Sequence, residues 1–268
     1  FFGSIVSPLG GFVGSPATAY TTNCGPWDRR PIALATDSTI VLLKVARSCY
    51  FVNVPDLDRT DSQRRSDGER THAAILDAAM RVASIEGLGS LSIGRLAREL
   101  QISKSGVFAH FRSKQRLQLE TIEAAERVFA REVIEPGLDA PEGVAQLEGL
   151  CEAYLSYVER GVFPGGCFFA HLLAEFDAPE GILHDAVAEG QAGWLDMVTG
   201  LVRTAQSREE LAPDLDARQL AFELYAALEL ANFLGTLYRD RAAIERGRTS
   251  VRDAIARAKT RANGRNAP

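Results

Sequence analysis

The residues best suited to chemistry lie in a short polar run from Ser103 to His110. Lys104 carries a positive charge, and the serines on either side carry hydroxyls that donate or accept hydrogen bonds. Helical spacing puts Val107 and Phe111 on the inner side of this run. The outer side then holds Lys104, Ser105, Gly106, Ala109 and His110. Such an exposed face suits contact with phosphates and base edges.

Two earlier helical patterns must position this run. The first has one apolar face and stops at Gly87 and Gly89; its inner residues are Ile75, Ala78, Ala79, Val82 and Ala83. Ser92 can cap a second helix, whose inner residues are Ile93, Leu96, Ala97 and Leu100. Two residues later Ser103 can cap a third helix over 104–110. Two short helices joined this tightly must cross steeply, which predicts a helix-turn-helix unit.

The distribution of charge favours a partner of negative charge for this unit. Residues 68–117 hold eight basic and four acidic side chains, a net charge of +4, whereas the whole chain is −5. A positive segment within an acidic protein is typical of nucleic-acid binding. A solvated basic face on a small helical bundle is the alternative that charge alone leaves open.

The same stretch resembles the tetracycline-repressor (TetR) family of one-component bacterial regulators. The resemblance is carried by ILDAA at 75–79, IGRLAREL at 93–100, ISKSGVFAHF at 102–111 and SKQRL at 113–117. It implies that the run from Ser103 to Gly106 begins the recognition helix and that His110 and Lys114 grip phosphate. Phe108 stands where the family commonly has tyrosine. The DNA-binding residues expected are Ser92, Ser103, Lys104, Ser105, Gly106, Phe108, His110 and Lys114.

The rest of the chain predicts a helical body. Ser113 can cap a long helix that closes before Pro136, and further apolar stripes follow over 147–158, 179–205 and from Asp216 to Asp240. The stretch after Asp216 is apolar on more than one side, so we expect its own body and a second subunit to cover it. The stripe expected at the subunit interface, shared with the preceding long helix, is Leu220, Leu224, Ala227, Leu228, Ala231 and Leu234.

Aromatic residues with polar tips are numerous in this body and could line an apolar pocket with a few polar groups. The ligand-binding residues expected are Phe129, Tyr154, Phe168, His171, Trp194, Tyr225 and Glu229. Individually, most of them fit equally well in the core or a subunit interface. Glu229 and Asn232 are more informative, since polar groups in an apolar helix need partners.

No motif points to catalysis, a metal or a cofactor. GxSxG, HExxH, GxxxxGK and GxGxxG are absent, and the histidines lack ligand-like spacing. The cysteines Cys24, Cys49, Cys151 and Cys167 are far apart with no CxxC pair, which argues against a zinc site and a disulfide framework and favours the cytoplasm. No uninterrupted apolar run reaches eighteen residues, so we expect no membrane span. An enzyme, or a helical small-molecule-binding protein that does not bind DNA, is the alternative.

Residues 1–67 differ in composition, with scattered prolines and no sustained helical period, and are expected to be a largely unstructured extension. The chain begins without methionine, which fits a fragment or an upstream start. Arg64 and Arg65 could reach DNA, although a solvated linker explains them as well. The expected organisation is therefore all-α: the extension at 1–67, a helix-turn-helix DNA-binding domain at 68–117, a ligand-binding and dimerisation domain at 118–262, and a frayed tail at 263–268.

Overall fold

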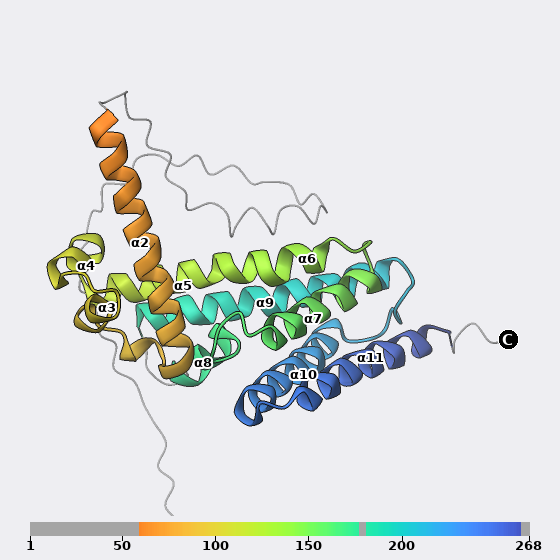
Figure 1. The fold of residues 1–268 in the computed structure, drawn as a ribbon. Coiled ribbons are helices and arrows are strands. Elements are labelled where there is room, and N and C mark those ends of the chain that lie inside the picture. Colours follow the sequence, from red (N-terminus) through yellow and green to blue (C-terminus); the bar gives the residue numbers. More distant parts are fainter. Residues whose placement is uncertain (1–58, 177–180, 264–268) are drawn as a thin grey trace, which may run out of the picture. The chain divides into compact units, whose positions relative to one another are not determined.

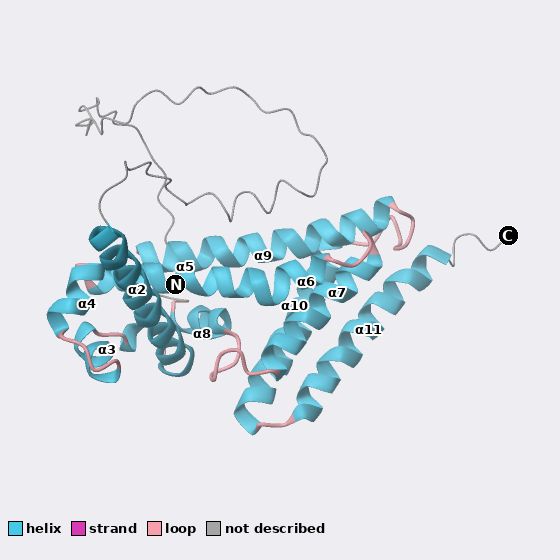
Figure 2. Cartoon of the chain, turned by 45° about the horizontal axis from the view of Figure 1, so that its top comes forward, coloured by secondary structure: helices cyan, strands magenta, loops and turns pink. Residues whose placement is uncertain are grey.

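The computed structural model describes residues 59–176 and 181–263, and all regular structure in these ranges is helical (Figures 1 and 2). The expected all-α class, with a three-helix head, a long connecting helix and a helical body, is confirmed. The expected extension lies outside the described residues as far as residue 58, and the tail from 264 does too.

The head consists of α2 (Arg59–Glu86), the short turn η1 (Leu88–Ser90), α3 (Ile93–Glu99) and α4 (Lys104–Phe111). Its first helix starts earlier than the sequence indicated, because residues 59–67 form the first turns of α2. These residues are polar and have no apolar spacing that would reveal a helix. Extending a helix that its apolar residues have already anchored costs little, since only its nucleation is unfavourable.

Local side-chain caps explain where several helices begin. The expected cap residues all accept a hydrogen bond from an amide of the first turn: Ser92 from Arg95, Ser103 from Gly106, Ser113 from Arg116, and Asp216 from Arg218 and Gln219. Each bond satisfies a backbone donor that has no partner within its helix. These four helix starts therefore depend on residues within one turn of each other.

The helix that connects head and body continues further than expected. It runs as α5 (Lys114–Phe129), a π-helical turn η2 (Ala130–Ile134) and α6 (Glu135–Leu138), so it does not close before Pro136. Proline lacks an amide hydrogen and its ring clashes with the carbonyl four residues back in an α-helix. The wider π turn relieves this conflict by shifting the hydrogen-bond register.

The body contains α7 (Val144–Glu159), α8 (Phe168–Glu175), α9 (Ile182–Ser207), α10 (Ala217–Tyr238) and α11 (Arg241–Asn263). Helix α9 runs beside α5, and α10 and α11 form an adjacent pair in both views (Figures 1 and 2). Helix α10 also packs on α9 and α7, and α8 lies against both α2 and α9.

Helix α10 has apolar residues on two sides, as expected, but the stripe that we assigned to the subunit interface is not the uncovered one. Four of its residues, Leu220, Leu224, Leu228 and Ala231, are buried within the chain, and the other two, Ala227 and Leu234, are half-buried. The uncovered stripe is Phe222, Leu230, Phe233 and Leu237, with exposed fractions of 59%, 58%, 43% and 71%. We call these four residues the α10 stripe. A helix apolar on all sides gives no local signal for which side faces its own body.

By length and composition, α10 is also the one described helix that is apolar enough to cross a membrane. The core helix of a folded domain meets the same criterion. Helix α10 packs on three helices and carries Glu229 and the buried Asn232, so the core explanation accounts for it.

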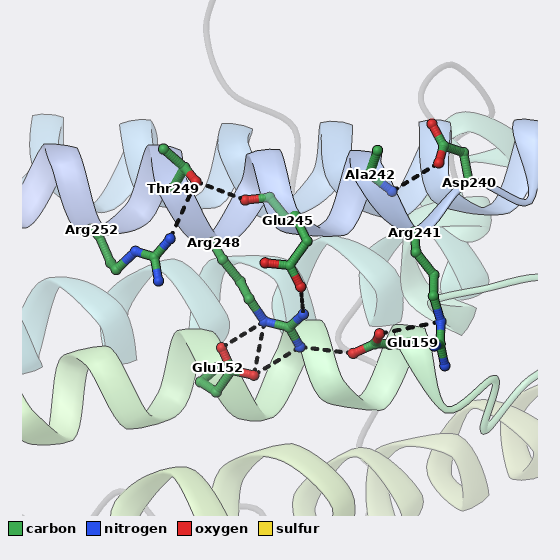
Figure 3. Close-up of polar contacts among 9 residues, drawn as sticks. All are labelled: Glu152, Glu159, Asp240, Arg241, Ala242, Glu245, Arg248, Thr249 and Arg252. Carbon is green, nitrogen blue, oxygen red and sulfur yellow. Dashed lines mark hydrogen bonds and ion pairs between the residues drawn. The ribbon is translucent and has the colours of Figure 1, made fainter.

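A cluster of charged side chains joins α11 to α7 (Figure 3). The Arg248 side chain is 16% exposed; its guanidinium contacts Glu152 at 2.9 Å, Glu159 at 2.8 Å and Glu245 at 2.6 Å. The hydrogen bond from Arg248 holds the pKa of Glu159 below its ordinary value. One cation thus neutralises carboxylates on two helices, in the fork geometry that arginine provides.

We expect Arg248→Ala to destabilise the fold by about 1–2 kcal/mol, because it leaves neighbouring carboxylates without their cation. Thermal unfolding followed by circular dichroism should show a melting temperature lower by roughly 2–6 °C. Arg252→Ala is the matched control, because Arg252 is exposed and its side chain contacts Thr249 of its own helix. Equal melting temperatures for the two variants would contradict a stabilising role for the cluster.

The same contact should make the difference depend on pH. Because the pKa of Glu159 is lower in the folded state, its contribution is present above the ordinary glutamate pKa and is lost as the pH falls through the lowered value. The gap in melting temperature between the native protein and Arg248→Ala should therefore narrow in acid. A constant gap from neutral pH to about pH 3 would contradict this linkage.

Candidate functional site

The outer face of α4 is arranged as the sequence indicated. Ser103, Lys104 and Ser105 are exposed at its start, whereas Val107 and Phe111 are fully buried against the rest of the head. Phe108 lies on the outer face one turn after Lys104 and is 53% exposed. Gly106 and His110 are half-buried. A cation, hydroxyls and a phenyl ring therefore share one accessible face.

Two cations of this face are available for a partner. Among the described residues, neither Lys104 nor Arg112 has an ion pair or a side-chain hydrogen bond, and both are exposed. Sequence reasoning did not include Arg112 among the site residues. It directly follows the buried Phe111 and caps α4 in the left-handed conformation, with φ 60°. Its place after the last inner residue of the helix was the signal that could have found it.

Other expected site residues are partly engaged within the head. The Lys114 ammonium donates a hydrogen bond to the Gly89 carbonyl at 2.5 Å. Its other two N–H groups remain available to donate to a phosphate. The Ser92 hydroxyl serves as the cap of α3. Burial, and then the neighbouring His72, lower the pKa of His110, so at neutral pH its ring is uncharged and offers one N–H donor.

Ion pairs inside the head reduce its positive field. Arg95 pairs with Glu86, Arg116 with Glu120, and Arg70 with Asp67. The net charge of residues 68–117 therefore overstates the positive charge available to a DNA partner, because these three cations are already paired with carboxylates. Of the described cations in this range left without a carboxylate, Lys104, Arg112 and Lys114 lie on α4 and the residues that follow it, whereas Arg81 and Arg98 lie on α2 and α3.

Most of the expected ligand-binding residues come together inside the body. The Tyr154 hydroxyl donates to Glu229 at 2.8 Å, and the ring of Tyr154 contacts Trp194 with centroids 6.1 Å apart. Phe129 contacts both rings, at 6.3 Å from Tyr154 and 5.2 Å from Trp194. The Tyr225 hydroxyl donates to Gln191 at 3.3 Å. We call Phe129, Tyr154, Trp194, Tyr225 and Glu229 the body cluster.

The two remaining residues of that set lie on α8. Phe168 is completely buried and packs on Phe163 and Phe169, and the latter ring reaches Phe129 at 5.7 Å. His171 is half-buried, and its Nδ1 atom has no hydrogen-bond partner. Phe169 and Gln191 were not expected at the site. Gln191 lies one turn before Trp194 on α9, so helical spacing could have identified it. No such spacing distinguishes Phe169 from the adjacent Phe168, which was the one expected.

Burial raises the pKa of Glu229, and the hydroxyls of Tyr154 and Tyr225 oppose that shift only in part. Burial also raises the thiol pKa of Cys151 and Cys167 to about 12. Since the thiolate is the reactive form, both cysteines behave as small buried hydrophobes rather than as sensors of oxidants. The body thus holds one acid whose pKa is raised by burial and two thiols that are rarely in the reactive form.

A pocket of about 420 Å³ opens between α8 and α9 beside this cluster. Its walls include Leu173, Val187 and Leu195, and Gln191, which binds Tyr225, also lines it. This volume falls in the range typical of small-molecule sites. Among the described residues, no group of histidine, cysteine and carboxylate side chains has the arrangement of a metal site.

Two contacts join the head to the body. The Glu175 carboxylate, at the end of α8, accepts hydrogen bonds from the amides of Leu88 at 2.6 Å and Gly89 at 2.5 Å. Gly165 lies so close to α2 that an added Cβ would stand 1.7 Å from the Ser84 carbonyl oxygen, so no other residue fits there without a shift. Helix α8 and the loop before it therefore connect the body cluster to the first helix of the head.

Comparisons with known proteins match both parts of the chain. Residues 75–121 match a family model described as "Bacterial regulatory proteins, tetR family", and residues 143–251 match a "Tetracyclin repressor-like, C-terminal domain". The transcriptional regulator AcuR of Cereibacter sphaeroides is 26% identical over 174 residues, which cover 63% of this chain and 78% of that protein.

Solved structures agree with these matches. A TetR transcriptional regulator from Chloroflexus aurantiacus is 26% identical, covers 71% of this chain and 96% of its own, and has a TM-score of 0.65. A putative transcriptional regulator from Saccharomonospora viridis, in complex with choline, is 22% identical over 70% of this chain and 96% of its own, with a TM-score of 0.57. At that identity the second structure shows likeness of fold only.

The α4 face leads to a test by mutation. We expect Lys104→Ala to weaken binding to all duplex DNA sequences alike and to reduce the slope of log affinity against log salt by about 1 per subunit, because one phosphate contact is lost. Fluorescence anisotropy at several salt concentrations measures both quantities. Arg218→Ala, which removes an exposed cation from the start of α10, is the control and should change neither. An unchanged slope for Lys104→Ala would remove this residue from the phosphate contacts.

Proposed function

Because the chain belongs to the tetR family of bacterial regulatory proteins, we propose that it is a dimeric repressor released from DNA by a small molecule in its body. Members of this family are transcriptional regulators with an N-terminal DNA-binding domain and a C-terminal ligand-binding domain, and they are generally not enzymes. The alternative of an enzyme, or of a binding protein without DNA contact, has no feature of the site in its favour.

The observation that carries the proposal is the polar outer face of α4, whose inner residues are locked into the head. In the proposed complex α4 enters the major groove, where Ser103, Lys104, Ser105 and Gly106 approach base edges and the nearest phosphates. Arg112 and Lys114 stand beside them as further phosphate-binding groups. Phe108 has no hydroxyl for a phosphate, so it contributes apolar contact instead.

The α10 stripe supports a homodimer, which places two heads on one pseudo-palindromic operator. Four large apolar side chains exposed along one helix form a surface that water solvates poorly and that a second copy can cover by two-fold symmetry. Half-sites in such complexes lie about 34 Å or a multiple of it apart. We expect the operator close to the protein's own gene and the protein in the cytoplasm, where that DNA is.

The body cluster and the adjoining pocket are the proposed effector site. The Saccharomonospora viridis regulator, which has the same fold, was solved in complex with the small molecule choline. Within this chain, Asn232 lies one turn after Glu229 and accepts a hydrogen bond from the Cys167 amide, directly before α8. An effector that shifts α8 would therefore move the Glu175 contact with the head. A hundredfold loss of operator affinity requires a coupling free energy of about 3 kcal/mol.

The direct test is to find the operator and measure binding to it. Selection of bound sequences from random duplexes, followed by footprinting beside the gene, should yield a two-fold symmetric site protected by a dimer. Affinity for that site should fall steeply with salt, with a slope set by the phosphates contacted. If the protein bound neither a selected site nor random duplex DNA at low salt, the proposed function would be rejected. The alternative of a binding protein without DNA contact would then remain.

The dimer interface has its own test. Leu230→Glu puts a charge in the middle of the α10 stripe, where two-fold symmetry would bring it near its own copy, so we expect folded monomers that bind the operator at least tenfold more weakly. Ile182→Glu is the matched control, because Ile182 is 53% exposed on α9, outside the stripe. Sedimentation velocity measures the mass of each variant. Dimers of Leu230→Glu would place the interface on another surface.

The contact between body and head can be tested without knowing the effector. Glu175→Ala removes both acceptors from the Leu88 and Gly89 amides, so their hydrogen exchange should become at least tenfold faster while the helix content stays unchanged. Glu189→Ala, which removes an exposed carboxylate from α9, is the control. Exchange measured by NMR at these amides decides the outcome, and equal protection in both variants would rule out the contact in solution.

A further inference from the structure

Glu229 is a half-buried acid without a counter-charge in the body. Its Oε1 atom accepts the hydrogen bond from Tyr154, and the Tyr225 hydroxyl also lies close enough to lower the pKa of Glu229, while the buried Oε2 atom has no hydrogen bond of ordinary geometry. Among the described residues, no lysine, arginine or histidine neutralises it, and no cation contributes to its pKa shift. A desolvated carboxylate is unfavourable unless it is paired or protonated, so a group that supplies positive charge would stabilise this site.

Three more buried polar atoms of the body lack partners. The Nδ2 atom of Asn232 and the Nε1 atom of Trp194 are buried without a hydrogen bond, and so is Nδ1 of His171. Asn232 is 1% exposed and follows Glu229 by one turn on the same helix, and Trp194 contacts the tyrosine that binds Glu229. Folded proteins leave few buried polar atoms unsatisfied. The unsatisfied atoms of Glu229, Asn232 and Trp194, which the Tyr154 contacts or helical spacing bring into one part of the body, therefore point to a polar ligand there.

The surroundings of Glu229 are aromatic. Tyr154, Trp194 and Phe129 contact one another, and Tyr225 lies close to Glu229 and bonds to Gln191 of the pocket wall. Aromatic faces carry negative charge density and attract organic cations, more strongly where water is excluded. A carboxylate bordered by such rings favours a cation and disfavours an anion, because an anion would meet both the acid and the ring faces.

The pocket between α8 and α9 supplies room for the rest of such a molecule. Leu173, Phe176, Val187, Ala188, Ala192 and Leu195 give it apolar walls, and His184 and Gln191 are its two polar lining residues. Gln191 links this wall through Tyr225 to Glu229, which does not itself line the pocket. A ligand with an apolar part and a compact charged group could therefore extend from the pocket past Tyr225 toward the acid.

We infer that the effector of this protein is a small organic cation, an alkylammonium compound, whose charged group pairs with the Glu229 carboxylate while its apolar part extends past Tyr225 and Gln191 toward the α8–α9 pocket. The inference rests on the proposed function only in treating the body as an effector site. It identifies Glu229 as the residue that selects charge, with Trp194 and Asn232 as the polar and aromatic groups beside it. Neutral and anionic compounds of the same shape are the competing classes.

The experiment compares compounds that differ in charge alone. Choline and 3,3-dimethylbutan-1-ol have the same shape, but a quaternary carbon replaces the charged nitrogen in the second. Isothermal titration of the full-length protein with this pair, and with methylammonium, butylammonium and tetramethylammonium, measures direct binding without DNA. We expect at least one cation to bind, and to bind at least tenfold more tightly than its uncharged isostere.

Glu229→Gln keeps an acceptor for Tyr154 and removes the charge, so the variant should lose the preference for the cation while its melting temperature does not fall. Glu223→Gln, an exposed carboxylate on the same helix, is the matched control and should retain the preference. Binding of none of the cations, equal affinity for cation and isostere, or an unchanged preference in Glu229→Gln would each overturn the inference. Operator binding is measured separately by anisotropy, so loss of DNA binding would count against the proposed function and not against the cation site.

Discussion

The need to cover α10 on two sides is the constraint on which the rest of the body depends. Its inner side packs on α7, α9 and α11, and that side also carries Glu229 and Asn232 into the interior. Its outer side leaves the α10 stripe uncovered. One helix therefore contributes both to the proposed effector site and to the proposed dimer interface. A change in how α10 packs would alter the geometry of both.

The polar atoms around Glu229 and the contacts of Glu175 belong to one connected arrangement. Asn232 holds the amide of Cys167, the loop before α8 touches α2 through Gly165, and the end of α8 binds the head through Glu175. Each contact is a hydrogen bond or a backbone approach that tolerates little displacement. A short helix held at both ends can transmit a shift of the body to the DNA-binding head, since packed interfaces rearrange between discrete states rather than deforming gradually.

Much of the candidate DNA-binding face could be predicted from the sequence, and less of the ligand site. The exposed positions of Lys104 and Ser105 follow from the spacing of two buried residues within one helix. By contrast, Lys114 was assigned to phosphate alone, whereas its ammonium also binds the Gly89 carbonyl, 25 residues earlier in the chain. In the body, Tyr154 and Glu229 were expected and do meet, but Phe169 and Gln191 were not, because their positions depend on how α8 and α9 pack.

The sequence by itself determined the helices of the head, their serine caps and the all-α class, because these follow from interactions between residues within one or two turns of each other. It also determined that α10 is apolar on two sides. Only the tertiary structure decided which side of α10 faces inward, that Pro136 continues the helix through a π turn, and that Glu175 reaches the head. These features depend on how separate helices pack, and no local spacing of residues encodes that.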